Sequence, residues 1–169
     1  MTTALVAIGS SVLGGALGSL ITTLLRGRYE RDAQLRDRML AAADDFATGA
    51  LQAQMQLWEA AAVPSTRGGD QTADAAHVAE QLPETLRRIA VAHARLARIY
   101  VLFGKDTPAG RDAKATIDAL WSGRDALQRK PDPVPADALA AMGEALGLLD
   151  SFTARAREAL AQPWKLPTS

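Results

Sequence analysis

The chain has 169 residues, with 19 basic and 19 acidic side chains and a formal net charge of zero at pH 7. This balance argues against a globally cationic nucleic-acid-binding protein and against an acidic disordered chain. The absence of cysteine excludes thiolate catalysis, disulfides and cysteine-ligated zinc. A count of 35 alanines and very few aromatic residues favours helix throughout, and no segment is typical of a β-strand.

Residues 4–25 form an uncharged, apolar run of 22 residues. As a helix this run would measure about 33 Å, enough to cross a hydrocarbon core of about 30 Å. No basic residue precedes it and Arg26 follows it directly, which differs from a cleaved signal peptide. The alternative is a buried helix of a soluble protein. The length of the run and its place near the chain's start favour a transmembrane anchor at 1–25, a helical bundle at 26–162 and a tail at 163–169.

The residues after the predicted anchor indicate its orientation. The stretch from residue 26 to residue 38 carries five arginines, whereas no lysine or arginine precedes the run: Arg26, Arg28, Arg31, Arg36 and Arg38. Because cytoplasmic flanks are enriched in basic residues, the pattern predicts a single-pass protein of the cell membrane with its N-terminus outside and its bundle in the cytoplasm. We expect Arg26, Arg28 and Arg31 also to contact anionic lipid headgroups.

One face of the predicted anchor carries only small side chains. Gly14 and Gly18 have the GxxxG spacing. The residues on this face are Ser11, Gly14, Gly15, Gly18 and Thr22. Small residues let helix backbones approach closely in lipid, so the pattern predicts a homo-oligomer that associates through the anchor. The alternative is that glycine is simply frequent in membrane helices.

The remaining chain predicts four helices, the first of which can continue from the anchor because no proline occurs between residues 4 and 63. Turn-forming residues at 64–70 end it. The second, 72–103, contains Pro83, which must start a new helix or kink this one, and stops at Gly104. The third begins with Thr107 as cap and Pro108 in its first turn. The fourth lies between Pro135 and Pro163. Short connections make an antiparallel, coiled-coil-like bundle of about four helices the expected all-α fold.

Apolar spacing predicts which side chains face the core. In the first helix these are Leu35, Met39, Ala42, Phe46, Ala50 and Leu57. In the second they are Leu82, Leu86, Ile89, His93, Leu96, Tyr100 and Phe103. In the third and fourth they are Ile117, Leu120, Trp121, Leu127, Leu139, Met142, Leu146, Leu149, Phe152, Ala156 and Leu160.

No pattern specifies a reaction. A di-iron site in a bundle needs Glu-x-x-His pairs, and neither His77 nor His93 has a glutamate three residues before it. His77 is instead expected at the surface. The sequence also has no glycine-rich phosphate loop after a strand and no serine with a matching histidine motif. We therefore predict a protein that is not an enzyme and takes no cofactor or metal. His93 is predicted to be a partly buried, hydrogen-bonded imidazole, with a pH-sensitive switch as the alternative.

The arginines of the second helix do not indicate nucleic-acid binding. We expect Arg87, Arg88, Arg95 and Arg98 to pair across helices with acidic residues: Asp44, Asp45, Glu59 and Glu144. Binding of nucleic acid would need a broader positive excess and interleaved aromatic residues. In the tail, Trp164 either packs on the bundle, which is the commoner arrangement, or contacts a partner.

Three segments together carry a resemblance: the glycine-rich span GSSVLGGALGSLITTLL, the arginine-studded exit RGRYERDAQLRDRMLAAADDF, and a later helix that ends in LFG. In this order they resemble a loose group of uncharacterised single-pass bacterial membrane proteins. Arginine outnumbers lysine by 15 to 4, as in proteins of GC-rich bacterial genomes. The resemblance implies the topology described above and no activity or site residue.

Two functional hypotheses follow from these patterns. The first is a non-catalytic, membrane-tethered interaction or scaffold protein that binds a cytoplasmic protein partner. The alternative is an oligomeric membrane effector that permeabilises the bilayer through its Gly/Ser-rich span. The alternative rests on the small and mildly polar stripe of Ser11, Gly15, Gly18 and Thr22.

Overall fold

The computed structural model describes residues 3–62, 71–129 and 134–161, with only the backbone described for 3–29 and 71–74. The chain divides into two compact units, of which residues 38–163 are the larger. In the part of the chain that the structure describes, no helix combines the length and the apolar character needed to cross a membrane. The side chains of residues 4–25, on which the anchor prediction depends, are not among those described.

Four helices make up the described chain, and the all-α prediction is confirmed. They are α1 (Thr3–Ala62), α2 (Gln71–Phe103), α3 (Pro108–Arg129) and α4 (Ala136–Ala161). The proline-free stretch up to residue 63 forms one continuous helix, as its sequence predicts. Helix α2 continues through Pro83, so the alternative in which a new helix starts at this proline is wrong. The connection predicted at 64–70 lies outside the described residues, as do residues 130–133 of the connection that the proline-rich run at 130–135 predicts.

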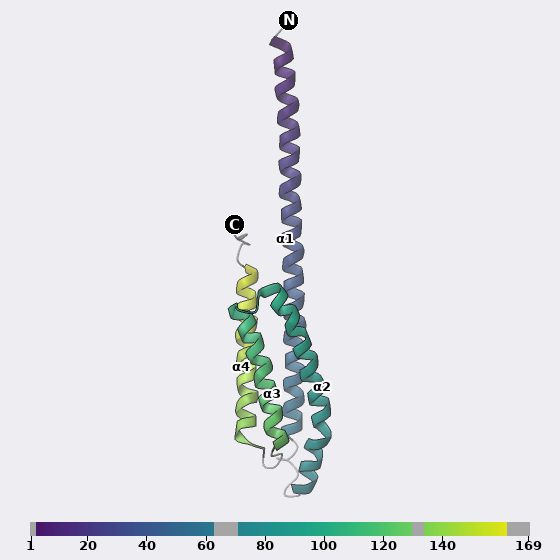
Figure 1. The fold of residues 1–169 in the computed structure, drawn as a ribbon, viewed down its shortest axis with the longest axis vertical. Helices are drawn as coiled ribbons and strands as arrows, with labels where there is room; N and C mark the ends of the chain where they lie inside the picture. The colour runs from purple at the N-terminus through teal and green to yellow at the C-terminus, as the bar shows by residue number, and fades with distance from the viewer. Residues whose placement is uncertain (1–2, 63–70, 130–133, 162–169) are drawn as a thin grey trace. The chain divides into compact units, whose positions relative to one another are not determined.

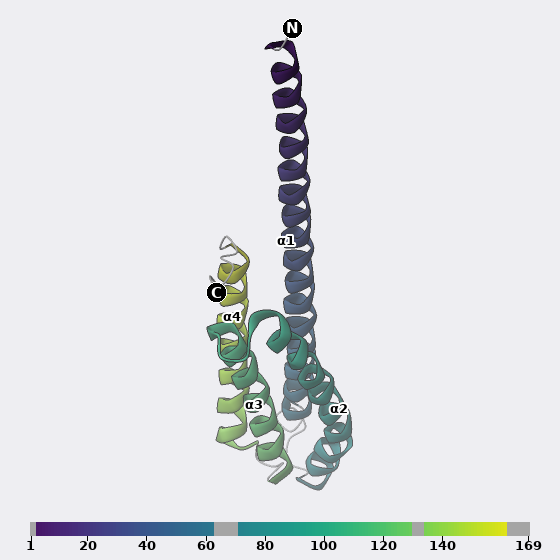
Figure 2. The same cartoon turned by 45° about the horizontal axis from the view of Figure 1, so that its top comes forward.

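Within residues 38–163 the helices form a bundle in which successive helices alternate in direction (Figures 1 and 2). Contacts between side chains place α1 beside both α2 and α4. Arg95 of α2 lies against Asp45 of α1, and the rings of Phe46 in α1 and Phe152 in α4 are 4.9 Å apart. Helix α3 packs against α2 and α4. The order around the bundle is therefore α1, α2, α3, α4.

Alanines and a few large residues fill the core together. The largest fully buried apolar side chains are Phe46, Leu57, Val78, Ile89, Ile99, Ile117, Leu120, Leu127, Met142 and Phe152. Between them lie many buried alanines, such as Ala53, Ala113 and Ala138. Because an alanine side chain occupies little volume, helices that meet at alanines can approach closely. The buried residues predicted for the first and third helices are confirmed, except that Leu35 and Trp121 are only partly buried.

The predicted core faces of α2 and α4 are partly wrong. In α2, Leu86 and His93 are exposed, and Thr85, Ala92 and Ile99 are buried in their place. In α4, the predicted inward residues Leu139 and Leu146 are exposed, and the preceding alanines, Ala138 and Ala145, are buried. In α2 every second core position from Leu86 to the partly buried Tyr100 is therefore shifted by one residue, whereas in α4 only the positions of Leu139 and Leu146 are shifted. The smaller side chain faces inward because the helices lie close together there.

The turn between α2 and α3 has the capping features that the sequence predicts. Gly104 ends α2 with a φ of 90°, a backbone conformation that favours glycine, and its N–H donates to the carbonyl of Tyr100. Thr107 caps α3, because its hydroxyl oxygen accepts a hydrogen bond from the N–H of Gly110 at 3.1 Å. The same hydroxyl donates to the carbonyl of Gly104 at 2.8 Å. These bonds hold the end of α2 directly over the first turn of α3.

Candidate interaction surface

The site residues predicted from the sequence fall mostly outside the described side chains. This applies to the small stripe of Ser11, Gly14, Gly15, Gly18 and Thr22, and to Arg26 and Arg28. Trp164 also lies outside the described residues. Arg31 is described and is exposed. The oligomerisation stripe therefore stays a prediction. The described residues contain a different candidate surface.

Large apolar side chains are exposed together on α1 and α4. They are Leu51, Met55 and Trp58 of α1 and Leu139 and Leu146 of α4. Met55 is 63% exposed and Trp58 is 42% exposed. We call this set the α1/α4 face. Scattered exposed apolar residues are normal in soluble domains, but a group of five on two neighbouring helices is typical of a binding surface.

A hydrogen bond between the two helices shows that these side chains flank one seam. The buried amide of Gln54 donates to the carbonyl oxygen of Met142 at 2.7 Å. Leu51 and Trp58 lie three residues before and four residues after Gln54, so they share its side of α1. Leu139 and Leu146 have the same spacing around Met142 on α4.

Because α1 and α4 are antiparallel, Leu51 lies level with Leu146, and Trp58 lies level with Leu139. The two pairs therefore border the outer edge of the seam, one on each side of the Gln54 hydrogen bond.

The outer side of α4 has exposed backbone without side chains next to Leu139 and Leu146. Gly143 and Gly147 are exposed, and a Cβ built on either would meet no atom within 4 Å. The α1/α4 face therefore combines a ridge of large side chains on α1 with a strip on α4 where another backbone can approach closely. Sequence analysis missed this surface because it assigned Leu139 and Leu146 to the core.

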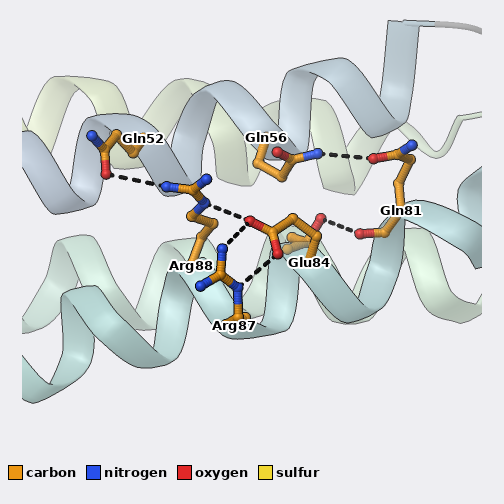
Figure 3. Close-up of polar contacts among 7 residues, drawn as sticks. Gln52, Gln56, Gln81, Glu84, Arg87 and Arg88 are labelled. Carbon is orange, nitrogen blue, oxygen red and sulfur yellow. Dashed lines mark hydrogen bonds and ion pairs between the residues drawn. The ribbon is translucent and has the colours of Figure 1, made fainter.

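The opposite seam, between α1 and α2, is closed by polar contacts (Figure 3). Glu84 accepts hydrogen bonds from Arg87 and Arg88, each at 2.7 Å, and Arg88 also reaches Gln52 of α1. Gln56 donates to the side chain of Gln81 at 3.0 Å. The hydrogen bonds from Arg87 and then Arg88 lower the pKa of the Glu84 carboxyl from its ordinary 4.5 to about 2.

The lowered pKa of Glu84 predicts a pH-dependent contribution to stability. Because the pKa is lowered in the folded chain, the ionised Glu84 carboxylate contributes fully to the free energy of unfolding above about pH 4.5. This contribution is lost as the pH falls towards 2. The free energy of unfolding of the Glu84→Gln variant should therefore lie below that of the native chain at pH 6, and the difference should vanish near pH 2. Urea titrations of both full chains at a series of pH values measure it. A difference that is constant with pH would show that the ion pairs contribute nothing.

One arginine also crosses this seam over a glycine. Arg95 Nη1 donates to the backbone oxygen of Asp45 at 2.9 Å, and Nη2 lies 3.3 Å from the Asp45 carboxylate. The guanidinium occupies the space beside Gly49, since a Cβ there would overlap Nη1 and lie 3.2 Å from Cζ. The contact confirms the predicted pairing of Arg95 with Asp45. The pairings expected for Arg87 and Arg88 with the acidic residues of other helices are wrong, because both bind Glu84 of their own helix.

Gly49 and Arg95 should therefore be energetically coupled. Gly49→Ala alone improves helix propensity but displaces the guanidinium from Asp45, so we expect it to leave stability unchanged or lower it slightly. In an Arg95→Ala background the same substitution should stabilise the chain by about 0.5–1 kcal/mol. A double-mutant cycle measured by urea unfolding should give a coupling energy of about 0.5–1.5 kcal/mol. Additive effects would contradict the packing of Arg95 over Gly49.

Two further polar clusters lie on α3. The carboxylate of Asp112 in α3 lies 2.7 Å from both Ser151 Oγ and Arg155 Nε of α4. These contacts link the two helices. At the end of α3, a shallow polar hollow is lined by Ser122, Arg124, Asp125, Gln128 and Arg129. There Asp125 pairs with Arg124 at 2.9 Å, so the hollow holds charges of both signs.

The histidines differ from their predicted environments. His93 is exposed, so the prediction of a partly buried imidazole is wrong, and the switch that required its burial loses its basis. His77 is partly buried, and its Nε2 has no hydrogen-bond partner in the described chain. Among the described side chains, no group of three histidines, aspartates or glutamates is arranged to hold a metal ion.

Comparison of the chain with known protein families, with curated proteins and with solved structures finds no match. The α1/α4 face is therefore interpreted from its own geometry.

Proposed function

We propose that this protein is a non-catalytic interaction or scaffold protein, tethered to the cell membrane, whose binding surface is the α1/α4 face. The observation that carries the proposal is the exposure of five large apolar side chains along one seam of the bundle. Burying such a surface against a partner removes apolar area from water, which is the main favourable term in protein association. The helices themselves supply a rigid support for the surface.

The tether is inferred from the sequence of residues 4–25. The uncharged run is long enough to span a bilayer, and the arginines that follow it favour a cytoplasmic bundle. A reporter fused after Ser169 should be active only if it functions in the cytoplasm. Replacement of Arg26, Arg28 and Arg31 by glutamine, with lysines added after Met1, should weaken or invert the orientation. Activity of an extracytoplasmic reporter on the native chain would overturn the proposed topology.

Site-specific photo-crosslinking in native membranes tests the interaction. A photoreactive amino acid at Met55 should give a discrete adduct with another protein chain, because this side chain projects from the centre of the α1/α4 face. The same amino acid at Lys114, an exposed position on α3, serves as the matched control and should give none. The absence of adducts from Met55, Trp58 and Leu146 alike would contradict the proposed binding surface.

A membrane effector is the second candidate, supported by the small and mildly polar stripe of the span. Release of a trapped dye from liposomes that contain the full chain separates the two proposals. Leakage that disappears when Gly14 and Gly18 are replaced by leucine would favour the effector. Liposomes that stay sealed would favour the interaction protein.

A further inference from the structure

The charges around the centre of the α1/α4 face have one sign, and the nearest cation on the same side of α4 is Arg157, about 16 Å beyond Leu146. No lysine or arginine occurs between Arg38 and Arg67 or between Lys130 and Arg155, the stretches that supply this part of α1 and α4. Exposed carboxylates lie around the apolar centre, and none of them forms an ion pair with a described residue: Asp44, Glu59 and Asp150. The closest arginine before this stretch of α1, Arg38, is about 25 Å from Met55 along the helix axis.

The seam between α1 and α2 differs in this respect. There the carboxylate of Glu84 lies against two arginines and that of Asp45 lies against Arg95. The bundle therefore neutralises the carboxylates on one side of α1 and leaves those on the other side uncompensated. Uncompensated charges of one sign around an apolar centre attract partners of the opposite sign and exclude those of the same sign.

The shape of the face indicates the form of the partner. The α1 side chains Leu51, Met55 and Trp58 have i, i+4, i+7 spacing, so they form a straight ridge along the helix. The bare strip at Gly143 and Gly147 runs parallel to it on α4. A ridge beside a parallel strip of exposed backbone fits a helix laid along the seam, which buries its own apolar stripe at the same spacing.

We propose that the α1/α4 face binds a basic amphipathic helix of a protein partner. This inference rests on the proposed function and names the chemistry of the partner. The apolar stripe of the incoming helix packs on Met55 and over Gly143, and its flanking lysines or arginines reach Glu59 on α1 and Asp150 on α4. A second copy of this chain fits the face less well, since a pair that met through it would bring like carboxylates together.

Binding of synthetic peptides to the full chain in phosphatidylcholine nanodiscs tests the inference. The probe is a fluorescent 18-residue helical peptide with leucines at i, i+4, i+7 and i+11 and lysines on both flanks. One control peptide has glutamate in place of every lysine, and another has the same composition with the leucines dispersed. Empty nanodiscs correct for binding to lipid. The lysine peptide should bind at least about tenfold more tightly than either control, and its affinity should fall with added salt.

Variants of the chain then locate the site. Glu59→Gln combined with Asp150→Asn should weaken binding of the lysine peptide by about three- to tenfold. The matched control, Glu80→Gln with Asp106→Asn, removes two exposed carboxylates outside the face and should leave binding unchanged. Met55→Lys should abolish binding, and because this side chain is exposed, the helical content measured by circular dichroism should be retained.

Four results would overturn the inference. Equal binding of the lysine and glutamate peptides would show that the face does not discriminate by charge, and so would native affinity in the Glu59 and Asp150 variant. If Met55→Lys instead converts an oligomer of the full chain to a monomer, a second copy covers the face. A crosslinked partner whose contact segment is not basic would overturn this inference while preserving the proposed function.

Discussion

Phe152→Ala should lower the free energy of unfolding by about 3–5 kcal/mol, the usual cost of removing a buried phenylalanine. Phe152 is fully buried and joins three helices, since its ring lies 4.9 Å from that of Phe46 in α1 and 6.5 Å from that of Phe103 at the end of α2. Both pairs have edge-to-face geometry. Urea unfolding of the full chain in a mild detergent, followed by tryptophan fluorescence, measures the effect.

Leu146→Ala is the matched control on the same helix. Leu146 is 44% exposed, so its truncation should cost less than about 1 kcal/mol. If the two substitutions destabilise the chain equally, Leu146 belongs to the core and the described register of α4 is wrong. That result would also remove one of the five members of the α1/α4 face.

Gly110→Ala should destabilise the chain by about 2–3 kcal/mol, although alanine is ordinarily the better helix former. A Cβ on Gly110 would overlap the carbonyl oxygen of Gly104 and lie 2.9 Å from that of Lys105. These are backbone atoms, and the hydrogen bond from Thr107 fixes the first of them. The turn would therefore have to open to admit the methyl group. Thermal or urea unfolding of the full chain measures the loss.

Gly143→Ala provides the opposite case in the same measurement. A Cβ there meets nothing within 4 Å, so the substitution should stabilise the chain by up to about 1 kcal/mol through helix propensity alone. A gain of similar size in both variants would show that the turn at Gly104 is looser than described. The pair of substitutions thus separates steric exclusion from the general cost of glycine in a helix.

Local features of the sequence were sufficient to predict the four helices and the turn between α2 and α3. Proline and glycine positions determine where helices end, and Thr107 is a strong cap whatever packs around it. The inward face of α1 was also predicted, because Phe46 has no large apolar neighbour on either side and so determines the register of the stripe. These features depend on short-range backbone chemistry, which a single sequence contains.

The register of α2 and α4 could not be predicted in the same way. In α4, Leu139 and Ala138 both fit a core position of the repeat, and the larger residue was assigned to the core by its hydrophobicity. The choice is decided by how closely α3 and α4 approach, for example where Gly123 of α3 faces Ala141. That distance is a property of the whole bundle. Leu139 and Leu146 of the α1/α4 face were predicted to lie in the core. For this reason the face could not be recognised from the sequence alone.

Membrane extraction tests the central claim that this bundle is tethered by residues 4–25. Membranes from cells that express the full chain are washed with alkaline carbonate, which releases peripheral proteins and retains those that span the bilayer. The native chain should remain in the membrane pellet. Leu13→Arg with Leu17→Arg should move it to the supernatant, because each arginine near the centre of a span costs about 2.5–3.5 kcal/mol. Release of the native chain by carbonate, or equal retention of both chains, would contradict the tether.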